Sequence, residues 1–100
     1  MRKKTVKRQK IVAVSLLKQA IDDLGGRAVE RDTGEERSMT RAVKAFNDMY
    51  GTEMTDEMGW MFMVFLKASR ARGGSFRVDD YADGASYFSL AGEAASVERD

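Results

Sequence analysis

The segment from Thr55 to Ala94 constrains the fold of this chain more than any other part of the sequence. At its centre, Trp60 to Leu66 is an unbroken apolar run, far shorter than the roughly 20 residues that a membrane-spanning helix needs. Apolar side chains on every side are typical of a helix surrounded by other helices. The sequence therefore predicts a central helix in a helical domain, and no membrane span.

The ends of this predicted helix are marked by residues with clear preferences. Thr55 is a favoured N-cap, and Asp56 and Glu57 follow it where the positive end of the helix dipole favours carboxylates. The double glycine Gly73-Gly74 interrupts the chain beyond the helix, because glycine tolerates the conformation of a C-cap. The sequence therefore predicts that this helix begins at Thr55 and ends at the double glycine.

A further helix is predicted after the double glycine, with Asp79 or Asp80 as its N-cap. Many of its residues are small, which lets another backbone approach closely. We therefore expect tight helix packing along this segment. The small residues are Ala82, Gly84, Ala85, Ser86, Ala91 and Gly92.

Near the N-terminus, apolar residues recur at spacings of three and four, which places them on one face of a helix. Gly25-Gly26 is predicted to end this helix, and the charged segment from Arg27 to Arg37 is predicted to be a loop or a short irregular hairpin. The residues of the predicted apolar face are Ile11, Val14, Leu17, Ile21 and Leu24.

Another helix is predicted between this loop and Thr55. Ser38 or Thr40 can cap it, and Gly51 closes it. Its apolar face consists of Met39, Val43, Phe46 and Tyr50. Together these segments predict an all-α bundle of about four helices, with residues 11–96 as a single domain and residues 1–10 as a basic N-terminal extension.

Composition limits the chemistry that the chain can support. Its 100 residues include no cysteine and no histidine, which excludes disulfides and thiolate metal sites and removes the commonest general base. The apolar run after the basic N-terminus is interrupted by Lys18 and lacks a convincing cleavage site, which argues against a signal peptide. We expect a cytoplasmic protein with no catalytic residue and no cofactor.

The N-terminus carries a strong positive charge. The first ten residues hold +6 and the remaining ninety hold −5, within a net charge of +1. Such a run can bind phosphates, with an affinity that falls steeply with salt, or it can be a solvated extension of the first helix. It contains no aromatic residue to stack on a base. The candidate residues for nucleic acid or another acidic partner are Arg2, Lys3, Lys4, Lys7, Arg8 and Lys10.

A polar cluster is predicted between the last two helices. Lys67 and Arg70 lie on one face of the first of them, and Asp80, Asp83 and Tyr87 lie on one face of the second. If the two helices pack antiparallel, these faces can meet. One interpretation is a salt-bridge cluster that fixes the register of the helices. The other is a ligand site in which the two basic side chains receive an anion.

A variant of the second interpretation places magnesium on Asp80 and Asp83, bridging to the phosphates of a nucleotide. This arrangement is similar to that of MazG-like all-α nucleotide pyrophosphatases, in which carboxylates spaced three apart on two helices hold magnesium. Only one such pair is evident here. Magnesium is therefore expected only under this alternative.

The last 45 residues resemble a family of small phage and prophage proteins of unknown function. In that family a Lys-x-x-Arg helix precedes an Asp-Tyr-x-Asp-x-x-x-Tyr helix that ends in Ala-Gly-Glu. The matching positions begin at Lys67, Asp80 and Ala91. Upstream, this chain departs from the family pattern. Thr33-Gly34 stands where the family has Tyr-Gly, and Ser38 stands where it has Asn. The resemblance implies a helical fold and a phage setting, and it implies no reaction.

These observations lead to three functional hypotheses. The first is a non-enzymatic phage accessory protein in the cytoplasm of the infected host cell, which binds a host or phage macromolecule and could inhibit a host defence or metabolic protein. The second is a magnesium-dependent nucleotide-binding or nucleotide pyrophosphatase-like protein. The third is nucleic-acid binding through the basic N-terminus. The apolar central helix also leaves a homodimer open.

Overall fold

The computed structural model describes residues 9–31 and 38–99, with the backbone alone described for residues 27–31. The described residues form four helices, α1 (Ala13–Arg31), α2 (Ser38–Tyr50), α3 (Asp56–Gly73) and α4 (Val78–Glu98), and they include no strand. The predicted all-α fold class is confirmed. Most of the basic N-terminal residues, and residues 32–37 of the predicted loop, lie outside the described residues.

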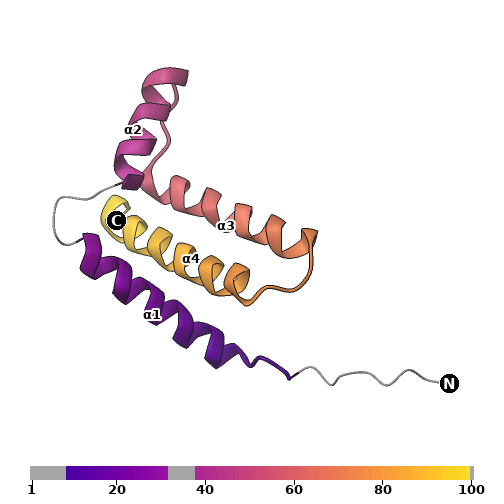
Figure 1. Cartoon of the computed structure of the whole chain (residues 1–100). Helices are drawn as coiled ribbons and strands as arrows, with labels where there is room; N and C mark the ends of the chain where they lie inside the picture. The colour runs from indigo at the N-terminus through magenta and orange to yellow at the C-terminus, as the bar shows by residue number, and fades with distance from the viewer. Residues whose placement is uncertain (1–8, 32–37, 100) are drawn as a thin grey trace.

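The helix α4 lies between α1 and α3 and contacts both of them (Figure 1). The helix α2 projects away from this layer, and among the described helices it packs only against α3. Within the same part of the chain, α1 packs only against α4. The position of α1 therefore depends on a single helix contact.

The interior consists of small side chains. The buried apolar residues are Ala20, Val43, Ala82 and Ala91, and Ser86 is fully buried. The prediction of tight packing on α4 is confirmed for Ala82, Ser86 and Ala91. It is wrong for Gly92, which is exposed and has open space where a side chain would project. Small side chains bring the helices together, and many larger ones stay outside.

The predicted end of α1 at Gly25-Gly26 is wrong, because the helix continues to Arg31. A glycine ends a helix when it adopts the left-handed conformation, and among the described residues only Gly51 has a positive φ. The predicted loop from Arg27 is therefore helical through Arg31. Both glycines lie on the exposed part of the helix, where a missing side chain leaves no gap in the packing.

The prediction that these apolar residues form the buried face of α1 is also wrong. Ala20 is 4% exposed and faces α4, where its carbonyl accepts the hydroxyl of the fully buried Ser86 at 3.5 Å. Small residues permit this close crossing, so the larger side chains lie to the flank. Leu24 is half-buried, but the other four predicted residues are between 41% and 66% exposed, namely Ile11, Val14, Leu17 and Ile21.

The helix α2 follows the predicted pattern only in part. Val43 is buried and Met39 is half-buried, whereas Phe46 and Tyr50 are 43% and 65% exposed and pack against each other with ring centroids 4.8 Å apart. Gly51 closes the helix with a φ of 67°, as predicted.

Asn47 holds the connection between α2 and α3. Its amide donates to the carbonyl of Met54 at 2.9 Å, and its side-chain oxygen accepts the Met54 N–H at 2.8 Å. The same oxygen accepts the Thr52 hydroxyl at 2.7 Å. Thr40 adds a bond from α2 to α3 by donating its hydroxyl to Asp56 at 2.6 Å.

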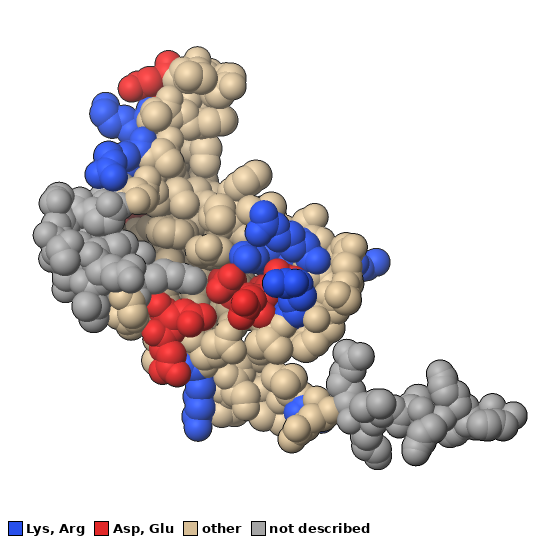
Figure 2. Space-filling model, in the orientation of Figure 1, with Lys and Arg blue, Asp and Glu red and all other residues tan. Residues whose placement is uncertain are grey.

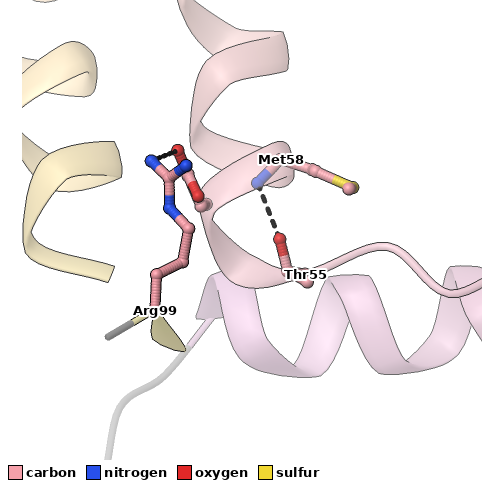
Figure 3. A network of polar contacts seen from close by, with 4 residues as sticks. Thr55, Met58 and Arg99 are labelled. Carbon is pink, nitrogen blue, oxygen red and sulfur yellow. Dashed lines mark hydrogen bonds and ion pairs between the residues drawn. The ribbon is translucent and has the colours of Figure 1, made fainter. Parts of the chain in front are cut away.

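The N-cap of α3 is confirmed. The Thr55 hydroxyl accepts the N–H of Met58 at 3.2 Å, and an ion pair of 2.9 Å joins Glu57 in the first turn to Arg99 beyond the end of α4 (Figure 3). The helix ends at Gly73, as predicted.

The prediction that neighbours surround α3 is wrong. Met58, Phe62 and Phe65 are 53%, 63% and 64% exposed. The helix α4 covers one side of α3, and α2 contacts only its beginning, where Gly59 packs beneath Met39 and Val43. One long neighbour cannot cover a helix that is apolar all round.

The predicted N-cap of α4 is wrong as well. Arg77 occupies the N-cap position with no side-chain capping bond. Asp79 and Asp80 lie within the first turn, where carboxylates interact favourably with the positive end of the helix dipole. These acidic residues therefore stabilise the beginning of the helix through charge.

Candidate functional site

The predicted polar cluster is centred on an ion pair between α3 and α4. The Lys67 ammonium lies 3.0 Å from the Asp83 carboxylate, and the two side chains are 13% and 18% exposed. A pair so little exposed is weakly screened by solvent. It therefore joins the two helices at one register.

Asp80 is the most buried charged residue of the cluster. It is 6% exposed, and among the described residues no side chain donates a hydrogen bond to its carboxylate. Its backbone N–H donates to the carbonyl of Arg77 at 3.1 Å. A buried carboxylate without a donor is costly, although its place in the first turn of α4 offsets part of this cost.

The other two predicted members lie at the edges of the cluster. Arg70 is exposed, and it makes no ion pair within the described residues. Tyr87 is half-buried and stacks on Trp60 of α3, with ring centroids 5.8 Å apart and an interplanar angle of 20°. This aromatic pair joins α3 to α4 beyond the ion pair, one helical turn away from Asp83 on α4 and two turns away from Lys67 on α3.

A polar hollow of about 730 Å³ opens beside the ion pair, at the turn between α3 and α4. Figure 2 shows acidic and basic side chains gathered over this end of the two helices. From α1, Gln19 donates to Asp79 at the hollow's edge at 2.9 Å. Three basic and three acidic side chains line the hollow, namely Lys67, Arg70, Arg77, Asp79, Asp80 and Asp83.

The hollow offers few ligands for a metal ion. The described residues contain no group of three or more acidic side chains that could hold one. Asp80 and Asp83 alone would leave most magnesium positions to water or phosphate oxygens. Asp83 is also paired with Lys67, whose ammonium would compete with a cation.

Two exposed apolar surfaces are the features that sequence reasoning missed. One is the exposed flank of α1, which contains Val14, Leu17 and Ile21 at 60%, 54% and 66% exposure. The other is the side of α3 that carries Met58, Phe62 and Phe65. Their helical spacing is visible in the sequence, but the same spacing is typical of a buried face, so it could not show that they are exposed.

Among the candidate basic residues of the N-terminus, Lys10 is the one that the structure describes, and it is exposed. The other candidate residues for nucleic acid, Arg2 to Arg8, lie outside the described residues. Within residues 9–31 and 38–99, no helix is long and apolar enough to cross a membrane.

Comparison of the chain with models of protein families, with curated proteins and with solved structures finds no match in any of the three.

Proposed function

We propose that this protein is a non-enzymatic phage accessory protein that binds a host or phage macromolecule in the cytoplasm of the infected cell. The observation that carries the proposal is the exposed flank of α1, where Val14, Leu17 and Ile21 are all more than half exposed. Contiguous apolar residues of this kind mark interaction surfaces. Inhibition of a host defence or metabolic protein is one consequence that such binding would have.

The surroundings of this face indicate the chemistry of the partner. Lys18 is exposed on α1, and Lys10 is exposed just before this helix begins, so the apolar residues have basic neighbours. A protein surface with an apolar groove and an acidic rim would complement them, because rim charges steer association while buried apolar anchors supply most of the affinity. We therefore favour a protein partner over a nucleic acid for this face.

Loss of two apolar anchors is expected to reduce partner recovery about tenfold or more. The experiment is a pull-down from nuclease-treated bacterial lysate with the tagged chain and its Leu17→Ser/Ile21→Ser variant, read by quantitative mass spectrometry. Val97→Ser is the matched control, because Val97 is 84% exposed on a different helix. Equal recovery of every protein by the double variant and the wild type would count against the proposal.

Nucleotide binding with magnesium at the polar hollow is the second candidate function, and the burial of Asp80 without a side-chain donor favours it. Asp80→Asn is expected to weaken magnesium-dependent ATP binding at least tenfold, because the charge that faces the cation is removed. Calorimetry with and without magnesium measures this effect. Asp48→Asn, on the exposed surface of α2, is the control. Failure of the wild-type chain to bind ATP excludes this candidate.

A further inference from the structure

The carboxylate of Asp80 is buried in the lining of the polar hollow without a donor. Asp80 is 6% exposed, and the neighbouring charges are engaged elsewhere. Lys67 pairs with Asp83, and Asp79 accepts from Gln19. A buried carboxylate is stabilised when a cation or a set of hydrogen-bond donors reaches it. The hollow is the space from which such a group can approach Asp80.

An organic ammonium group suits this carboxylate better than a metal ion does. Magnesium requires a near-octahedral set of oxygen ligands, and the described residues contain no group of three or more acidic side chains that could hold a metal. An ammonium group is a compact positive charge with three N–H donors and no demand for a fixed set of ligands. One buried carboxylate is therefore enough to bind it.

Two guanidinium groups of the hollow are available to an anion. Arg70 and Arg77 both line the hollow and are exposed, and neither makes an ion pair within the described residues. Arg70 lies three residues before Gly73-Gly74 and Arg77 three residues after it, so the turn brings both to the same end of the helix pair. A guanidinium group binds a carboxylate well, because its N–H groups match the two oxygens.

The hollow as a whole is polar and electrically balanced. Three basic and three acidic side chains line it, so a ligand with zero net charge matches it without leaving an excess of either sign. Among the lining residues none is aromatic or a large aliphatic residue, which favours a ligand that is small and polar. The uncharged lining residues are Ser69, Gly73, Gly74 and Ser75.

We propose that the hollow binds an α-amino acid with a small polar side chain, with its ammonium group on Asp80 and its carboxylate group on Arg70 and Arg77. A zwitterion of this kind supplies the cation that the buried carboxylate lacks and the anion that the two guanidinium groups can hold. The site goes beyond the proposed function, because it uses no residue of the exposed flank of α1. It also needs no magnesium, so this site and the nucleotide candidate can fail independently.

Titration of the full chain with serine, in buffer that contains EDTA, tests the site through the NMR spectrum of the backbone amides. Saturable shifts are expected at the turn that borders the hollow, at Gly73, Gly74 and Ser75. Ethanolamine lacks the carboxylate group and N-acetylserine lacks the ammonium group, and each is expected to bind about tenfold or more weakly than serine, because each loses one charged contact. The absence of saturable shifts with serine, or equal binding of serine and either analogue, would overturn the proposal.

Asp80→Asn distinguishes a ligand-binding role from a structural one. The amide has the same size as the carboxylate, so serine binding is expected to weaken about tenfold or more, whereas resistance to urea is expected to stay the same or rise, because a buried charge without a donor is removed. Unchanged serine affinity in this variant would overturn the proposal.

A second pair of variants tests the anion-binding end of the site. Arg77→Gln is expected to weaken serine binding while leaving the weak binding of ethanolamine unchanged, because ethanolamine has no carboxylate group to lose. Arg72→Gln is the matched control, since Arg72 is exposed on α3 outside the lining of the hollow, and it is expected to bind serine as the wild type does. Equal serine affinity of Arg77→Gln and Arg72→Gln would contradict the assignment of this end.

Discussion

Replacement of Lys67 by methionine is expected to lower the free energy of unfolding by about 2 kcal/mol, less than the roughly 3–5 kcal/mol typical of a fully buried ion pair, because both partners of the Lys67–Asp83 pair keep some exposure. Lys67 and Asp83 are 13% and 18% exposed and lie 3.0 Å apart. Without the ammonium, Asp83 remains poorly hydrated and close to the buried carboxylate of Asp80. Urea denaturation followed by far-ultraviolet circular dichroism measures the change.

Arg70→Met is the matched control for this experiment, because Arg70 lines the same hollow on the same helix but is exposed. Its stability is expected to change by no more than about 0.5 kcal/mol. The double variant Lys67→Met/Asp83→Leu is expected to recover part of the loss, since an apolar pair can replace a buried ion pair. Equal stability of Lys67→Met and Arg70→Met would show that the ion pair contributes little.

Replacement of Ser86 by leucine is expected to lower the free energy of unfolding by about 2 kcal/mol and to separate α1 from α4. Ser86 is fully buried where the two helices cross, next to the carbonyl of Ala20. A leucine side chain has no space there. Among the described helices α1 packs only on α4, so we expect its release to appear as faster proteolysis of α1 and weaker resistance to urea.

The same substitution at Ser89 provides the control. Ser89 is exposed on α4, three residues from Ser86, and its hydroxyl donates to the Ala85 carbonyl at 2.9 Å. Ser89→Leu changes helix propensity and polarity as Ser86→Leu does, but it inserts nothing between helices. Similar protease sensitivity in the two variants would contradict the importance of the small-residue crossing.

Local signals predicted helix boundaries well where one residue type was required for a geometric reason. Thr55 provides the capping oxygen for α3, and Gly51 adopts the positive φ that closes α2. The same reasoning failed at Gly25-Gly26, because glycine permits a left-handed conformation without requiring it. It also failed at the start of α4, where Arg77 is the N-cap without a side-chain bond.

The candidate site was predictable to the extent that helical spacing determines it. Spacing placed Lys67 on one face of α3 and Asp83 on one face of α4, and the structure brings these two together. Spacing could not show that Asp80 is buried while Arg70 is exposed. Burial depends on how far each side chain lies from the axis of contact between the helices, and a single helix carries no information about that axis.

The sequence by itself determined the helical class, the ends of α3, the closure of α2 and the small residues that let α4 pack closely. These features depend on contacts within a few residues, so local preferences are enough to specify them. Only the tertiary structure decided that Ala20 faces α4 while Leu17 and Ile21 remain exposed, and that Phe62 and Phe65 lie outside the helix contacts. Apolar periodicity shows which side chains share a face. Which face is covered depends on the neighbouring helices. In the described part of the chain, only α4 and α2 contact α3, and they do not cover all of its sides.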